Sequence, residues 1–130
     1  MAIGCEVTAL ETVPEYVIDV PGCRIIVADY DKLPGNLGRF DMAFIDGPGA
    51  YEFEKKGMKP DRSFSAYHAK RHTDLVYMHD GGMGQEEVFN DPLWEKIGGN
   101  DTDLIYRKKQ WDTLGLWQQI SLIGLRWRRW

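Results

Sequence analysis

The chain has 130 residues, enough for one compact domain with a buried core. Hydrophobic residues make up 43% and charged residues 28%, which is ordinary for a globular protein rather than a disordered one. A formal net charge of −4 disfavours a dedicated nucleic-acid binder, which usually carries a basic stripe. No apolar run approaches the roughly 20 residues that a membrane span needs.

Strand patterns and turn signals alternate along the first third of the chain. Short apolar runs predict strands at residues 6–11, 23–29 and 41–46. The run "CRIIVAD" at 23–29 has a β-branched apolar centre, which is typical of a strand buried on both faces. Between the first two strands, Pro14 suits the first turn of a short helix.

Helix and strand patterns continue in the rest of the chain. Residues 62–72 predict a helix, and the mixed-charge stretch 52–62 before it predicts a surface loop. A second helix is predicted at 85–98, although Pro92 could divide it. Further strands are predicted at 73–80, 102–110 and 114–127.

This alternation predicts an α/β fold with a parallel sheet covered by helices on both faces. The chain contains no internal repeat and no linker, so residues 1–130 are expected to form a single domain. In such sheets, ligands bind beyond the carboxyl ends of the strands.

Four of the predicted strands finish on an acidic residue. These residues are Glu11, Asp29, Asp46 and Asp80. A single acid after a strand is common, because Asp is a good turn former. Four acids at the same edge of one sheet favour a ligand-binding rim over coincidence.

The first two acids suit contacts with neutral polar groups. Glu11 could accept hydrogen bonds from vicinal hydroxyls, as an acid at a strand end does for a ribose in dinucleotide folds. Asp29 could accept from an exocyclic amine, or it could simply cap the turn that follows.

Asp46 and Asp80 are expected to lie close together on neighbouring strands. Two adjacent carboxylates repel unless a proton or a cation lies between them. Such a pair of oxygen ligands suits Mg²⁺, Mn²⁺ or Ca²⁺. His79 would point to the opposite face if its strand continued, although a loop conformation could turn it inward.

Four segments also resemble a known family. The stretches "EVTALETVPEY", "RIIVADYDKLP", "FDMAFIDGP" and "DLVYMHDGG" are similar to the second to fifth strands of class I S-adenosylmethionine-dependent methyltransferases. The similarity is closest to O-methyltransferase-like branches, including the plant polysaccharide methyltransferase type. Their Asp-Gly-Pro loop, downstream Arg and Tyr, and His-Asp pair have counterparts at Asp46-Gly47-Pro48, Arg62, Tyr67 and His79-Asp80.

The resemblance implies a role for each matching residue. The implied cofactor-binding residues are Glu11 at the ribose, Asp29 near the adenine, and Asp46, Gly47 and Pro48. Asp46 and Asp80 would hold a divalent cation such as Mg²⁺, and His79 and Asp80 would be catalytic. Arg62 and Tyr67 would contact the substrate. His79 is the candidate base, since the ordinary pKa of histidine suits proton transfer near neutral pH.

One part of the family pattern has no counterpart. Only "MAIG" precedes the strand that ends at Glu11, so the family's first strand and glycine-rich loop are missing, and "GGMG" follows the fifth strand instead. The predicted fold is therefore a three-layer, mostly parallel Rossmann-like methyltransferase sheet without its first strand–helix unit. A sheet without that strand would expose edges, which predicts a partner chain or a homo-oligomer.

The leading functional hypothesis is methyl transfer from S-adenosylmethionine to an oxygen of a small molecule or saccharide. The alternative is a non-catalytic remnant of the fold, or an assembly subunit that uses it for protein contacts. No nucleic acid or membrane partner is expected. Two cysteines are too few for a disulfide scaffold, and the N-terminus lacks a signal-peptide pattern, so the expected location is the cytoplasm.

Overall fold

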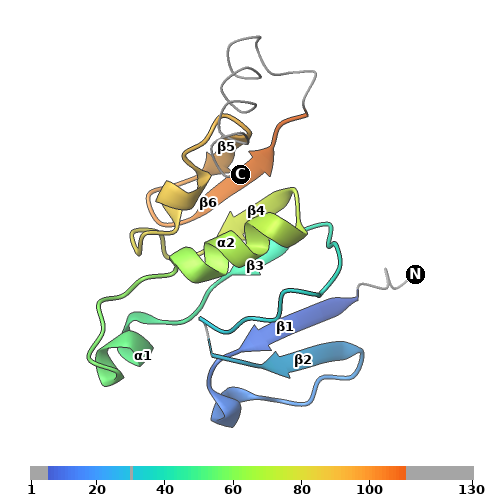
Figure 1. The fold of residues 1–130 in the computed structure, drawn as a ribbon, viewed down its shortest axis with the longest axis vertical. Helices are drawn as coiled ribbons and strands as arrows, with labels where there is room; N and C mark the ends of the chain where they lie inside the picture. The colour runs from blue at the N-terminus through green and yellow to red at the C-terminus, as the bar shows by residue number, and fades with distance from the viewer. Residues whose placement is uncertain (1–5, 30, 111–130) are drawn as a thin grey trace, which may run out of the picture. The chain divides into compact units, whose positions relative to one another are not determined.

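A computed structural model describes residues 6–29 and 31–110 and shows a small α/β protein. The chain divides into two compact units, Met1–Leu37 and Gly38–Trp130, each with its own sheet (Figure 1). That the whole chain forms a single domain stays a prediction. Within the described ranges, no helix has the length and apolar character that crossing a bilayer would require. The strand expected at 114–127 lies outside them.

The first unit is built on two parallel strands. Strand β1 (Val7–Glu11) pairs with β2 (Cys23–Val27), and the short 3-10 helix η1 (Pro14–Tyr16) lies between them in the chain. The backbone N–H of Ala28 donates to the carbonyl of Glu11 over 3.0 Å, so pairing continues to the carboxyl end of β1. Both strands and the short helix were predicted from the sequence.

The expected burial of the second strand on both faces is not found. Ile25 and Ile26 are half-buried and Val27 is exposed. Two strands alone leave both sheet edges open and offer few neighbours to enclose the apolar side chains.

The second unit holds a four-stranded sheet in the order β3-β4-β6-β5. These strands are β3 (Ala43–Ile45), β4 (Leu75–Met78), β6 (Leu104–Lys108) and β5 (Trp94–Gly99). Strands β3 and β4 are parallel, whereas β6 runs antiparallel to both β4 and β5. The mostly parallel sheet expected from the sequence is therefore not seen, because β6 is inserted in the reverse direction.

The helices match the sequence only in part. The predicted helix at 62–72 is confirmed as α2 (Ser63–His72), whereas α1 (Ala50–Lys55) begins in a stretch expected to be loop. The predicted helix at 85–98 is wrong: Glu86–Phe89 forms the short 3-10 helix η2, and β5 follows. Pro92 interrupts the helical hydrogen bonds, and pairing with β6 stabilises the extended form of the residues after it.

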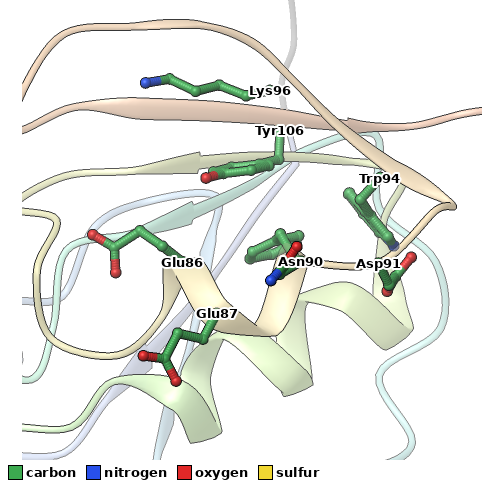
Figure 2. Close-up of a pocket in the computed structure, with 8 residues that line it drawn as sticks. Glu86, Glu87, Asn90, Asp91, Trp94, Lys96 and Tyr106 are labelled. Atoms are coloured by element: carbon green, nitrogen blue, oxygen red, sulfur yellow. The ribbon is translucent and has the colours of Figure 1, made fainter.

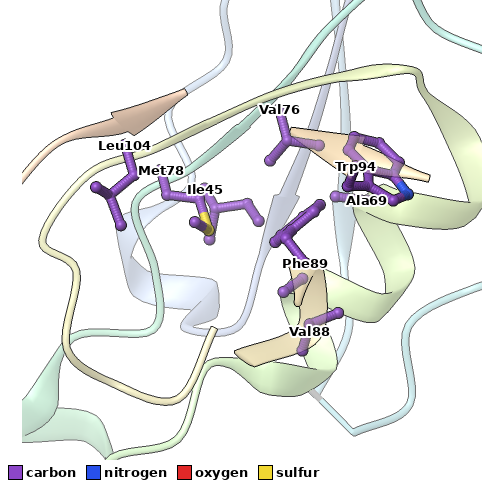
Figure 3. Close-up of a cluster of buried hydrophobic side chains, with 9 residues drawn as sticks. Ile45, Ala69, Val76, Met78, Val88, Phe89, Trp94 and Leu104 are labelled. Carbon is purple, nitrogen blue, oxygen red and sulfur yellow. The ribbon is translucent and has the colours of Figure 1, made fainter. Parts of the chain in front are cut away.

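The core of the second unit lies where α2 and η2 pack on the sheet (Figure 3). Along β4, Val76 and Met78 are fully buried while Leu75 and Tyr77 are only half-buried, as the alternation of a strand requires. The other buried members are Ile45, Ala66, Ala69, Val88, Phe89, Trp94 and Leu104. This packing holds β3 and β4 rigidly beside each other, with their carboxyl ends at one edge.

Candidate functional site

Three potential metal ligands meet where β3 and β4 end. Ile45 is aligned with Met78 across this parallel pair, so the residues that follow emerge at the same edge of the sheet. One ligand atom each from Asp46, His79 and Asp80 lies within 4.8 Å of the other two. The structure thus brings Asp46 and Asp80 together as the sequence predicts, and it adds His79.

The backbone after β4 explains why two consecutive side chains face the same group. The N–H of His79 still donates to the carbonyl of Ile45 over 2.9 Å, but the strand itself ends at Met78. Asp80 then adopts a left-handed conformation with φ of 53°, which Asp tolerates better than most residues. His79 Nε2 consequently lies 3.7 Å from Asp80 Oδ1 instead of on the opposite face.

The other ring nitrogen of His79 is held by Asp103. His79 Nδ1 lies 2.6 Å from Asp103 Oδ1. This hydrogen bond is the main reason that the pKa of His79 is raised, and partial burial opposes it. The same bond lowers the pKa of the Asp103 carboxyl. In the neutral ring, the Nδ1 proton therefore points to Asp103, and Nε2, 3.7 Å from Asp80 Oδ1, carries the lone pair.

Asp103 is positioned by the turn between β5 and β6. The Asn100 side-chain oxygen accepts hydrogen bonds from the backbone N–H groups of Thr102 and Asp103, at 2.8 and 2.7 Å. The N–H of Asn100 donates to the carbonyl of Asp103 over 2.7 Å. Sequence reasoning missed Asp103 because the predicted helix at 85–98 left no hairpin. The turn formers in "GGNDTD" are the signal that could have revealed it.

Arg62 holds the loops after β3 and β4 in place through hydrogen bonds to their backbone carbonyls. Its side chain is only 2% exposed, and burial lowers its pKa while Asp46 opposes that effect. Its Nε, Nη1 and Nη2 donate to the carbonyls of Pro48, His79 and Asp46, at 2.7, 2.8 and 2.9 Å. The buried guanidinium is directed at backbone carbonyls, which gives Arg62 a positioning role, and the substrate contact expected of it stays a prediction.

A second buried polar side chain, Gln85, holds the loop after β4. It is fully buried, its Nε2 donates to the carbonyl of Asp80 over 2.9 Å, and its Oε1 accepts from the N–H of Met83 over 2.9 Å. The carbonyl of Met83 in turn accepts from the N–H of Arg62 over 2.8 Å. No sequence pattern distinguished Gln85 from an ordinary surface residue.

The remaining predicted residues of this unit lie around the same loops. The Gly47–Pro48 peptide is cis, with Pro48 buried, and the carbonyl of Gly47 accepts from the hydroxyl of Ser65 over 3.4 Å. Tyr67 is 53% exposed on α2. Its ring is accessible to a ligand, but it takes part in none of the hydrogen bonds that build the site.

Glu11 and Asp29 belong to the first unit. One carboxylate oxygen of Glu11 accepts from the N–H groups of Thr12 and Val13, at 2.8 and 2.9 Å, which fixes the direction of the other oxygen. Asp29 is exposed and pairs with Lys32 over 3.4 Å, while its carbonyl accepts from the N–H of Lys32. Asp29 therefore begins the turn that follows β2, and its contact with the adenine stays a prediction.

A pocket of about 400 Å³ opens between η2, β5 and β6 (Figure 2). Phe89 and Tyr106 stack in it with ring centroids 4.8 Å apart, and Trp94 packs edge-on against Phe89 at 4.9 Å. Its lining residues are Glu86, Glu87, Phe89, Asn90, Asp91, Trp94, Lys96 and Tyr106. Glu86 also accepts a hydrogen bond from the N–H of Gly82, so the pocket adjoins the loop that carries Asp80.

Comparison with protein-family models, with curated proteins and with solved structures finds no match in any of the three. The geometry and chemistry of the residues themselves therefore carry the functional argument.

Proposed function

We propose that the chain is an S-adenosylmethionine-dependent methyltransferase-like domain that acts on an oxygen of a small molecule or saccharide. The observation that carries the proposal is the convergence of Asp46, His79 and Asp80 beyond two neighbouring parallel strands. Ligands of open α/β sheets bind at such carboxyl ends.

The donor set of this group fits a divalent cation. Asp46 and Asp80 are both exposed, and their negative charges repel when no cation lies between them. A bound cation would orient the acceptor hydroxyl and lower its pKa, which makes the oxygen a better nucleophile. Nε2 of His79 offers a lone pair that can either bind the ion or take the proton of the acceptor hydroxyl.

Residues of the chain also fit the methyl donor. Glu11 presents a carboxylate already oriented by two backbone N–H groups, which suits the two hydroxyls of a ribose. Asp29, the next acid of the same unit, would lie near the adenine. S-adenosylmethionine supplies an activated methyl group, and the residues of the site would orient donor and acceptor for in-line transfer.

We further propose that the fold is of the Rossmann-like, three-layer α/β kind. The parallel pairs β1–β2 and β3–β4 support this, as does β5, which runs in the same direction as β4 because both are antiparallel to β6.

The second candidate is an assembly domain without catalysis. Its support is the apolar surface of the first unit, where Ile18 is 74% exposed, Tyr16 56% and Val7 48%. Exposed apolar surface of this kind marks contact sites for other chains. An assembly domain would not need an oriented Glu11 or a group of metal ligands.

Calorimetric titration of S-adenosylmethionine and S-adenosylhomocysteine into the full chain separates the two candidates. We expect micromolar binding that weakens about 10- to 100-fold in Glu11→Gln, since a hydrogen bond to a charged acceptor is lost. Glu15→Gln, at an exposed acid of η1, is the matched control and should bind like the wild type. Absence of binding in the wild type would reject the methyltransferase proposal and favour the assembly domain.

A further inference from the structure

The nitrogen ligand in the Asp46–His79–Asp80 group bears on which metal the site takes. We propose that the site is built for a first-row transition ion, such as Mn²⁺, Fe²⁺ or Co²⁺, in preference to Mg²⁺ or Ca²⁺. We also infer that Asp103 is the residue that positions His79 for it. Both statements rest on the metal site of the proposed function and name its class of ion.

The first step is the tautomer of His79. Nδ1 lies 2.6 Å from an oxygen of Asp103. An ionised carboxylate accepts hydrogen bonds and cannot donate them, so Nδ1 carries the proton between the two. The Nδ1 proton therefore points to Asp103. Nε2 is left as the basic nitrogen, which is the form of imidazole that binds metals.

The basic nitrogen of His79 lies close to one of the two acids. Nε2 is the ring atom near Asp80, at 3.7 Å from Oδ1. Two ligands of one ion lie at most about 4.2 Å apart, since each bond is about 2.1 Å long. The observed span of 4.8 Å closes with a small rotation of the Asp46 and Asp80 side chains, both of which are exposed.

Hydrogen bonds from other residues hold Asp103, Asp46 and His79 in place. Asp103 is held through its backbone by Asn100, whose Nδ2 also lies 3.3 Å from Asp103 Oδ2. Arg62 fixes the backbone carbonyls of Asp46 and His79. A carboxylate that orients a histidine through its second nitrogen is the usual outer shell of a protein metal site. Asp103 is thus a positioning residue on the far side of the ring from the ion.

The donor set then selects the ion. Mg²⁺ and Ca²⁺ prefer oxygen ligands and gain little from an imidazole. Imidazole nitrogen suits the transition ions, whose affinity for a given site rises from Mn²⁺ through Fe²⁺ to Co²⁺. Two carboxylates with one imidazole leave open coordination positions for water or an acceptor oxygen.

Metal binding to the metal-free full chain tests the inference. Calorimetry with Mg²⁺, Mn²⁺ and Co²⁺ alone should give Co²⁺ an affinity at least about 100-fold higher than that of Mg²⁺. The electron spin echo of bound Mn²⁺ should show modulation from a ¹⁴N nucleus, and His79→Gln should abolish it. Equal affinities for Mg²⁺ and Co²⁺, or Mn²⁺ bound without ¹⁴N modulation, would overturn the proposal.

Two variants of the β5–β6 turn test the role of Asp103. Asp103→Asn should weaken Co²⁺ binding about 10- to 100-fold, the usual effect of losing an outer-shell partner, and change Mg²⁺ binding less than about 3-fold. Asp101→Asn, an exposed acid in the same turn, should change neither. Unchanged Co²⁺ affinity in a folded Asp103→Asn variant would refute the positioning role. If that variant does not fold, Asn100→Ala, which removes the side chain that holds Asp103, serves in its place with the same expectation.

These measurements contain no methyl donor, so the two proposals can fail separately. A transition-ion site with ¹⁴N modulation in a chain that does not bind S-adenosylmethionine would reject the methyltransferase and keep this inference. Binding of S-adenosylmethionine by a chain that binds Mg²⁺ as tightly as Co²⁺ would keep the methyltransferase proposal and reject this inference.

Discussion

At the scale of single residues, the site depends on buried polar side chains that would not touch a ligand. Arg62 and Gln85 are at most 2% exposed, and together they bind the carbonyls of Asp46, Pro48, His79 and Asp80. Burying such groups is costly unless their hydrogen bonds are made. Their removal should therefore affect both the stability of the unit and the geometry of the site.

Arg62→Lys tests this positioning role. A lysine keeps the charge but cannot present three nitrogens in one plane, so carbonyls that now accept from the guanidinium lose their partners. We expect the free energy of unfolding to fall by about 2–4 kcal/mol. Arg71→Lys, at an exposed position of α2, the helix that Arg62 precedes, should change it by less than about 0.5 kcal/mol. Urea denaturation gives both values, and equal effects would contradict the role of Arg62.

The His79–Asp103 pair makes a prediction about pH. The folded-state pKa of His79 is raised above its ordinary value of 6.5, so the protonated ring stabilises the fold. That contribution is fully present below pH 6.5 and is lost as the pH rises through the raised pKa. Urea denaturation of the metal-free protein between about pH 6 and pH 8.5 should show this loss in the wild type and not in His79→Gln. Parallel pH profiles for the two proteins would exclude the His79–Asp103 pair as the source of the loss of stability.

At the scale of elements, the sequence predicted the strands that carry the acids but not the hairpin that completes the site. Apolar runs closed by Asp46 and Asp80 signalled β3 and β4, and their parallel pairing followed from the expected α/β order. The run at 85–98 has few local features that separate a helix from a strand. Its extended form depends on pairing with β6, a tertiary interaction.

Two neighbouring glycines test the hairpin. Gly99 has φ of 117°, and a Cβ atom there would lie 2.0 Å from the carbonyl oxygen of Asp103. Gly99→Ala should therefore cost about 2–3 kcal/mol of unfolding free energy and weaken Co²⁺ binding, because Asp103 must move. At Gly98 the added Cβ meets only Ile105 at 3.6 Å, so Gly98→Ala should be much milder. Thermal unfolding and Co²⁺ titration of both variants check this, and equal losses would contradict the structure of the turn.

At the scale of the whole molecule, composition and the strand–helix alternation predicted an α/β protein correctly. They could not predict how far each strand is buried, because burial depends on the elements that pack against the strand, and the strand's own sequence does not reveal these. The run "CRIIVAD" is the clearest case: its sequence is that of an interior strand, yet Val27 is 48% exposed. Two strands alone cannot enclose such a run, so its apolar side chains stay partly exposed.

We propose that the methyl donor and the metal ion serve one reaction. The most direct measurement is the nuclear relaxation of S-adenosylmethionine carrying a ¹³C-labelled methyl group, bound to the full chain, as Mn²⁺ is added. Because paramagnetic relaxation falls steeply with distance, we predict strong broadening of the methyl signal in the wild type and none in Asp46→Asn. A bound cofactor whose methyl signal is unaffected by saturating Mn²⁺ would contradict the claim.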